Sequence, residues 1–220
     1  MHRQFENELK TLKEQILTMG GNVELAVEAA TQALIQRELG KLQTVYELED
    51  KINIEHKQVD EACVQLLARQ SPLATDLRFV IAILKISTDL ERMGDQAVNI
   101  SHNTKDYLQS PPLKPLIDIP LMAKEVRTMV RQSLDAFVKQ DKNLAQAVLH
   151  MDDTVDDLKD KVLNELIGMM EKDPTIIKPA IDLILIARNL ERLGDHATNI
   201  AEDVIYAVSG VDIRHGGGKK

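Results

Sequence analysis

The sequence predicts an all-α protein that consists of two tandem three-helix bundles. Apolar residues recur with helical periodicity along most of the chain, and no segment shows the alternation expected of a strand. The segment from Leu90 to Ile100 recurs from Leu190 to Ile200 with eight of eleven positions identical, which identifies an internal repeat. Four of the seven prolines cluster within residues 111–120 and mark the boundary between the halves: Pro111, Pro112, Pro115 and Pro120.

The first half, residues 1–112, is expected to form three helices, near 3–38, 41–69 and 73–108. Gly40 and the pair Ser71-Pro72 interrupt the periodic pattern and predict the two breaks, because glycine and proline disfavour helix interiors. The third helix carries an apolar stripe with spacings of three and four in alternation, which is typical of a helix packed in a bundle.

The second half, residues 113–210, is expected to form three further helices, near 119–140, 142–171 and 175–208. The pair Asp173-Pro174 predicts the break before the last of them. The first two helices of each half align with an offset of 103 residues and the third with an offset of 100, so the difference is absorbed in the loop before the third helix. Residues 211–220 are glycine-rich and basic, and we expect a flexible tail.

Composition excludes several classes of protein. The net charge is −8, aromatic residues make up 3% and tryptophan is absent, so a nucleic-acid partner is not expected. The single cysteine, Cys63, lies on an apolar helix face and fits a buried thiol in a reducing compartment. The N-terminus lacks an apolar signal region and the longest apolar run is too short to cross a bilayer, so we expect a cytoplasmic protein.

Acidic side chains recur in pairs four residues apart on the third helix of both halves and on the second helix of the second half, and the equivalent pair of the first half is Glu49 and Asn53. Residues at i and i+4 share a helix face, so each pair places two oxygen-bearing side chains together. If the second and third helices pack side by side, four such side chains meet in each half. We call them the first cluster, Glu49, Asn53, Glu91 and Asp95, and the second cluster, Asp152, Asp156, Glu191 and Asp195.

Clustered carboxylates without thiols favour hard or borderline cations such as Mg, Mn, Ca or Fe. Metal binding competes here with two simpler interpretations, a solvated acidic face and ion pairing with Arg92 and Arg192. His196 follows the second-cluster residue Asp195 and could add a nitrogen ligand, but its counterpart is Gln96, so a plain surface histidine is the alternative.

These motifs resemble the PhoU family, the phosphate-signalling accessory proteins of bacteria. The doubled motif reads Leu-Glu-Arg-Met-Gly-Asp at 90–95 and Leu-Glu-Arg-Leu-Gly-Asp at 190–195. Three further segments are similar to the family: Arg-Gln-Ser-Pro-Leu-Ala-Thr-Asp-Leu-Arg at 69–78, Gln-Ile-Leu-Thr-Met-Gly-Gly at 15–21 and Asp-Ile-Arg-His-Gly at 212–216. The resemblance covers essentially the whole chain.

The resemblance implies two three-helix bundles related by a pseudo-twofold axis. It also implies a cytoplasmic regulatory adaptor, without a reaction of its own, that couples a phosphate ABC transporter and its ATPase to a sensor histidine kinase. When phosphate is plentiful, such an adaptor is expected to hold the kinase in its repressing mode and to restrain phosphate uptake. A homodimer is expected, with membrane contact only through the partners.

Some members of this family carry metal clusters held by paired acidic motifs. The resemblance therefore assigns metal binding to the pairs Glu91–Asp95, Glu191–Asp195 and Asp152–Asp156. Asn53 departs from the pattern, because its amide oxygen can coordinate a cation but brings no charge. We expect the first cluster to bind a cation more weakly than the second.

Two alternatives come from other classes of protein. A carboxylate-bridged di-metal oxidase would use Glu-x-x-His pairs that point into the bundle core, and the sequence contains none. A purely structural dimerisation module would carry the acidic pairs only as solvated faces. Phosphate-cradling loops, nucleophile elbows and zinc-protease motifs are also absent from the sequence, which favours the adaptor.

The segment Leu73–Arg78 has no counterpart in the second half, so it is a candidate for a function that only the first half performs, such as docking a partner. Asp76 and Arg78 are the residues predicted to contact a partner. The alternative is a local one, in which Ser71 and Pro72 only start the third helix.

Overall fold

The computed structural model describes residues 2–70 and 72–213, which form six long helices and two short 3-10 turns. The first half contains α1 (His2–Gln36), η1 (Leu39–Lys41), α2 (Leu42–Arg69) and α3 (Ala74–Tyr107). The second half contains α4 (Asp118–Lys139), α5 (Lys142–Lys172), η2 (Pro174–Ile176) and α6 (Ile177–Ser209). The predicted all-α class is confirmed, and the described residues contain no strand.

The six helices follow the breaks expected from the sequence to within a few residues. The turn at Gly40 is η1, and the turn after Asp173 is η2, whose first residue is Pro174. Asp141 caps α5 by accepting hydrogen bonds from two backbone amides of its first turn. Gly210 ends α6 in the left-handed conformation, with φ of 72°. Residues 214–220 of the predicted tail lie outside the described residues.

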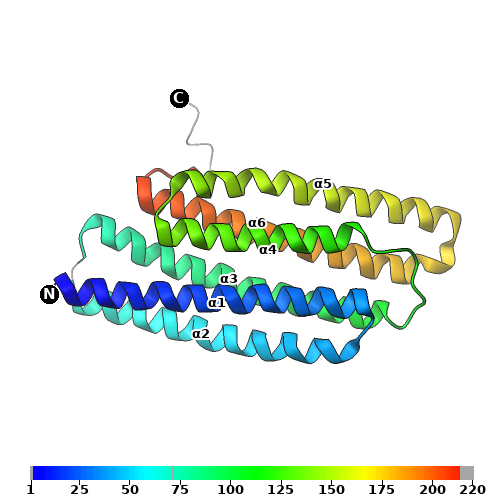
Figure 1. The fold of residues 1–220 in the computed structure, drawn as a ribbon, viewed down its shortest axis with the longest axis horizontal. Coiled ribbons are helices and arrows are strands. Elements are labelled where there is room, and N and C mark those ends of the chain that lie inside the picture. The colour runs from blue at the N-terminus through cyan, green and yellow to red at the C-terminus, as the bar shows by residue number, and fades with distance from the viewer. Residues whose placement is uncertain (1, 71, 214–220) are drawn as a thin grey trace.

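The two halves lie side by side along their full length (Figure 1). α1 and α4 run antiparallel to each other on one face, and α3 and α6 run antiparallel behind them. α2 packs against α1 and α3, while α5 packs against α4 and α6, so these two helices form the outer edges. The four inner helices thus bury one continuous apolar core that crosses the boundary between the halves.

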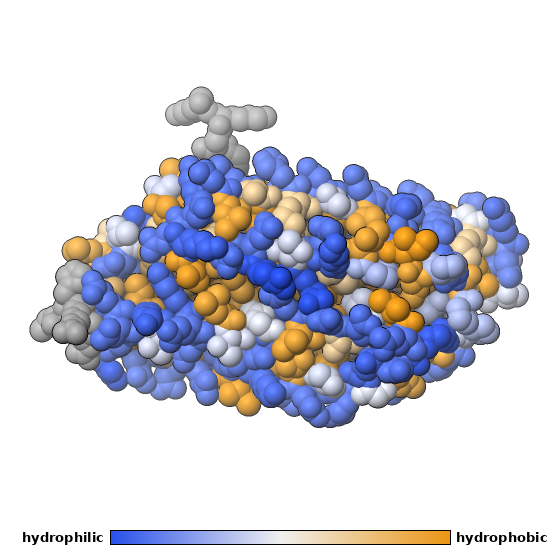
Figure 2. Space-filling model, in the orientation of Figure 1, coloured by the Kyte–Doolittle hydropathy of each residue, from blue (hydrophilic) through white to orange (hydrophobic). Residues whose placement is uncertain are grey.

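Ion pairs across the α1–α4 boundary follow the internal symmetry. Glu24 pairs with Arg131, and Glu28 pairs with Arg127 at 2.8 Å. Adding the offset of 103 residues to Glu24 gives Arg127, and adding it to Glu28 gives Arg131, so a pseudo-twofold axis exchanges the two pairs. Figure 2 shows hydrophilic side chains along this boundary, with scattered apolar ones to either side.

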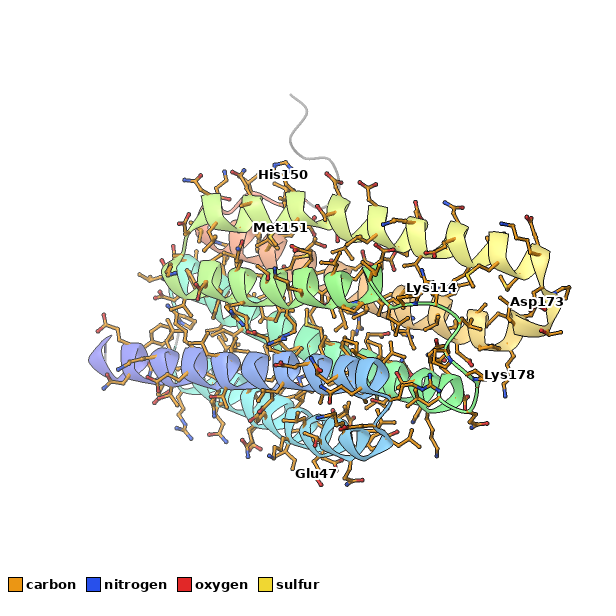
Figure 3. The ribbon with its side chains drawn as sticks, turned by 45° about the vertical axis from the view of Figure 1, so that its right-hand side comes forward. Glu47, Lys114, His150, Met151, Asp173 and Lys178 are labelled. Carbon is orange, nitrogen blue, oxygen red and sulfur yellow. The ribbon has the colours of Figure 1, made fainter. Side chains whose placement is uncertain are left out.

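The connection between the halves runs from the end of α3 to the start of α4, and it contains the predicted boundary between residues 112 and 113. Lys114 on this connection forms an ion pair with Glu165 of α5 (Figure 3). Arg37 at the end of α1 donates hydrogen bonds to the carbonyls of Leu108 and Ser110. The connection is therefore attached to both halves.

None of the helices described is both long and apolar enough to span a bilayer.

Candidate functional site

The motif glycines bring the second and third helices of each half together. A Cβ atom at Gly194 of α6 would lie 3.1 Å from a carboxylate oxygen of Asp152 on α5. A Cβ atom at Gly94 of α3 would lie 3.7 Å from Cγ of Glu49 on α2. The expected side-by-side packing is therefore present in both halves, and each motif glycine faces the acidic residue of the neighbouring helix.

The second cluster is an accumulation of negative charge. Partial burial, together with the charges of Asp195, Asp156 and Glu191, raises the pKa of Asp152 to about 6. Burial and the charge of Asp195 raise the pKa of Glu191, and burial and the charge of Asp156 raise the pKa of Asp195. Since each carboxylate feels its neighbours, the four side chains form one electrostatic unit spread over α5 and α6.

Lys159 is the cation that faces the second cluster. Its ammonium nitrogen lies 3.2 Å from a carboxylate oxygen of Asp156 and 3.7 Å from one of Glu191, so it bridges α5 and α6. It also contacts Asp160 at 3.3 Å. The charge of Arg192 also acts on Asp195, but four carboxylates outnumber these two cations, so the balance at this surface remains negative.

The first cluster is arranged differently. The Asn53 side chain donates a hydrogen bond of 2.5 Å to a carboxylate oxygen of Glu49, one turn away on α2. The amide thereby satisfies the carboxylate that faces Gly94. His56 occupies the position equivalent to Lys159 and contacts Ser87 of α3 at 2.7 Å through Nδ1. The first half therefore carries a hydrogen-bonded amide and an imidazole where the second half carries a second acid and a lysine.

These arrangements bear on metal binding. Within residues 2–70 and 72–213, no three histidine, cysteine or acidic side chains already converge in a geometry that could hold a metal ion. The donor types of the second cluster nevertheless fit a hard cation, because the four carboxylates are coupled and only partly neutralised. A cation there would require side-chain rotation and displacement of Lys159. The assignment of both clusters as metal ligands stays a prediction.

His196 does not join the second cluster. Its Nδ1 lies 2.8 Å from a carboxylate oxygen of Asp89 on α3, and the Asn199 amide approaches the same oxygen at 3.4 Å. Both the imidazole and its acidic partner are largely buried between the halves. The interpretation of His196 as a surface histidine is therefore wrong, because the packing of α6 against α3 turns its ring toward the other half.

A second polar contact joins α3 to α6 nearby. The Lys85 ammonium lies 3.0 Å from a carboxylate oxygen of Asp203, which is buried. Together with the pair His196–Asp89, this contact ties the two third helices to each other on the face opposite α1 and α4. The pseudo-equivalents of Lys85 and Asp203 are Leu185 and Asn103, so the charges are found on one side of the axis only.

The segment Leu73–Arg78 starts α3. Leu73 is the N-cap residue and provides no side-chain cap, and Ser71 lies outside the described residues. Asp76 is half-buried in the first turn, where a negative charge is favourable. The guanidinium of half-buried Arg78 lies against Gly210 at the end of α6. Arg78 therefore contacts the second half, and a partner contact for these two residues stays a prediction.

Two residues of this site escaped the sequence analysis. Lys159 could have been recognised, because it follows Asp156 by three positions and shares its helix face. Asp89 carried no such signal, because its partners belong to a helix more than a hundred residues away. Contacts within one helix follow from spacing, whereas contacts between the halves need the packed structure.

Comparison with known protein families gives one match. The model described as "PhoU domain" matches residues 16–104 and 119–204, once in each half. The chain is 41% identical over 216 residues to a Pseudomonas aeruginosa protein named phosphate-specific transport system accessory protein PhoU homolog. This alignment covers 97% of the chain and 88% of the relative.

Two solved structures share the fold. The crystal structure of PhoU from Pseudomonas aeruginosa superposes with a TM-score of 0.90 at 40% identity and covers 94% of this chain and 99% of that one. The phosphate transport system regulatory protein PhoU from Streptococcus pneumoniae superposes with a TM-score of 0.87 at 28% identity and covers 95% and 99%. The predicted architecture of paired three-helix bundles is thus confirmed.

Proposed function

The chain belongs to the PhoU family, and on that basis we propose that it is a cytoplasmic regulatory adaptor that couples a phosphate ABC transporter to a sensor histidine kinase. When phosphate is plentiful, it represses the starvation signal by keeping the kinase in its repressing mode, and it restrains uptake through the transporter's ATPase. It acts by binding and catalyses no reaction.

The observation that carries this proposal is the match of the family along both halves. A role in phosphate-transport regulation follows directly from that membership, because the relatives are named as accessory and regulatory proteins of phosphate transport. The links to a kinase and to an ATPase, the cytoplasmic location and a homodimeric state are the finer parts of the proposal. An adaptor needs two contact surfaces, and the two halves of this chain differ in charge where they are otherwise alike.

We also propose that the second cluster binds a divalent or iron-type cation. Asp152, Asp156, Glu191 and Asp195 would supply carboxylate oxygens, and the cation would neutralise their mutual repulsion. Lys159 would leave the cluster and become free to pair elsewhere. The first cluster would bind a cation more weakly, because Asn53 brings no charge and already bonds Glu49.

The test is made in the host of this protein. Deletion of the gene is expected to switch on a phosphate-starvation reporter in phosphate-replete medium and to accelerate phosphate uptake. Crosslinking of the tagged protein from phosphate-replete membranes is expected to recover the transporter's ATPase and a sensor kinase.

Each part of the proposal can fail separately. A reporter that stays repressed in the deletion strain would contradict the signalling role. Recovery of the ATPase without a kinase would reduce the proposal to transport control. Absence of both partners, with metal in the purified protein, would turn attention to redox assays for the di-metal oxidase alternative.

A further inference from the structure

An apolar ridge lies on the outer face of α6 near its start. Ile177, Ile181 and Leu185 follow one another at intervals of four and are 44%, 44% and 36% exposed. Residues with this spacing form a continuous ridge on one helix face. The α6 helix is packed against α3, α4 and α5, so this ridge is the side of α6 that its neighbours leave open.

Basic side chains flank this ridge. Lys178, Arg188 and Arg192 are exposed on the same stretch of α6, and Lys178 lies where α5 turns into α6 (Figure 3). The acids of α6 offset these cations only in part. Asp182 is buried beneath Lys178, and Glu191 is turned toward Lys159 on α5. Arg192 acts on the carboxylate of Asp195, and Arg188 forms no ion pair within the described residues. A cationic apolar surface is unusual in a chain with a net charge of −8.

A hollow between α5 and α6 borders the ridge. It has a volume of about 200 Å³, and it is lined by Lys159, Leu163, Ile184, Ala187, Arg188 and Glu191. Its apolar part can accept one side chain from a partner beside the ridge, next to the ion pair of Lys159 with Glu191. Ridge, hollow and cations together form what we call the α6 strip.

The corresponding face of α3 shows that these features are specific to the second half. Leu77 and Ile81 occupy the positions equivalent to Ile177 and Ile181 and are also exposed. Lys85 replaces Leu185 there, and it is held by the buried carboxylate of Asp203. The α3 face therefore has a shorter ridge, and its lysine is already neutralised.

We propose that the α6 strip docks one amphipathic helix of a partner protein, whose apolar ridge is flanked by acidic residues. Leucine-sized side chains spaced at three and four would pack along the ridge, and Asp or Glu would pair with the three cations. The inference rests on the proposed adaptor function, because it describes one of the surfaces that such a function needs.

Charge and exposure favour this occupant over the two others that an apolar strip could accept. A second copy that presented the same strip would bring like charges together at Lys178, Arg188 and Arg192. The same cations would attract an anionic bilayer, so the exposure of the ridge has to separate a helix from a lipid surface. The ridge is only partly exposed, which suits packing against another helix better than insertion among lipid chains.

The test places a photo-crosslinking residue at the centre of the strip. The full-length variant Ile181→p-benzoylphenylalanine is expressed in the host, irradiated in living cells, and its crosslinked peptides are sequenced by mass spectrometry. The matched control is Leu25→p-benzoylphenylalanine, at an isolated apolar residue of α1 that is 53% exposed. We expect a partner peptide from an acidic amphipathic helix at position 181, and none at position 25.

A second pair of variants tests the charges. Arg188→Glu with Arg192→Glu, in the Ile181 crosslinking background, should reduce the yield by roughly tenfold or more, because two attractive pairs become repulsive. Lys51→Glu with Lys57→Glu on the exposed face of α2 makes the same change in net charge and should leave the yield unchanged. Circular dichroism checks that all four proteins melt as the parent does.

Several outcomes would overturn the inference. These are a crosslink to a second copy of this chain, a crosslink to phospholipid, a partner peptide without acidic residues, or a yield at position 181 no greater than at position 25. A crosslink to an acidic helix of a protein outside the phosphate transporter and the kinase would keep the docking site. That same result would count against the proposed function, so the two can fail independently.

Discussion

The two clusters have the same helical frame but differ in how their charges are balanced. In the first, the Asn53 amide donates to Glu49 and the position of the lysine is taken by His56. In the second, burial and neighbouring carboxylates raise the pKa of Asp152, Glu191 and Asp195, and Lys159 bridges the two helices. Duplication therefore kept the packing of the second helix on the third, while the charge of the surface changed. A cation would therefore relieve more repulsion in the second half than in the first.

The largest expected difference is in metal content. Glu191→Ala should remove more bound metal than Glu91→Ala, because the second cluster holds four acids and the first holds three and an amide. We expect the affinity of the second half to fall by roughly tenfold or more, and that of the first half by less. Isothermal titration with Mn²⁺ and elemental analysis measure both. Equal losses would contradict the asymmetry.

The difference between the two clusters can be removed by supplying the acid that the first cluster lacks. Asn53→Asp removes the donor to Glu49 and adds a carboxylate, so the first cluster acquires the composition of the second. Its Mn²⁺ affinity should rise by about tenfold, which is the effect of one added charged ligand. The matched control is Asn99→Asp, at an exposed position of α3 one turn beyond the cluster. An increase in both variants would show that only net charge matters.

In the absence of metal, the stability of the protein should depend on pH through the second cluster. The pKa of Asp152 is raised from 3.8 to about 6, so the folded state holds this proton more tightly than the unfolded state. The resulting destabilisation is absent below about pH 4 and complete above about pH 6. Because the site is partly solvated, we expect Asp152→Asn to stabilise the protein by only about 1 kcal/mol at pH 7.

Urea unfolding with a chelator present tests this expectation. The gain from Asp152→Asn should shrink as the pH is lowered from 7 toward 4, because the wild-type carboxyl becomes protonated over this range. A gain from Asp152→Asn that is independent of pH would mean that the carboxylate is not the source of the effect.

The smallest expected difference is at the motif glycines. An alanine at Gly94 would find its nearest neighbours, two Ile52 side-chain atoms, at 3.4 and 3.5 Å, which is ordinary contact. Gly94→Ala should therefore gain up to about 1 kcal/mol from helix propensity. At Gly194 the new methyl would lie 3.1 Å from the Asp152 carboxylate, so Gly194→Ala should gain less or lose stability. Thermal melts measure the change in melting temperature for each variant. Equal changes would show that the Asp152 side chain moves away from the new methyl group without a cost in stability.

The sequence predicted the frame of this molecule better than its contacts. The duplicated motif, the proline-rich boundary and the heptad stripe determine six helices, because each depends on residues close together in the chain. The i and i+4 acids also followed from spacing. The link between His196 and Asp89 and the different space at the two glycines could not be predicted, because both depend on how distant helices approach.

The crossed pairs of Glu24 with Arg131 and Glu28 with Arg127 have a consequence for how such chains recognise themselves. Each pair is partly exposed and adds little to stability. Two first halves placed against each other would bring glutamate to glutamate, and two second halves would bring arginine to arginine. Charge along this boundary therefore disfavours the pairing of like halves and favours the pairing of complementary halves.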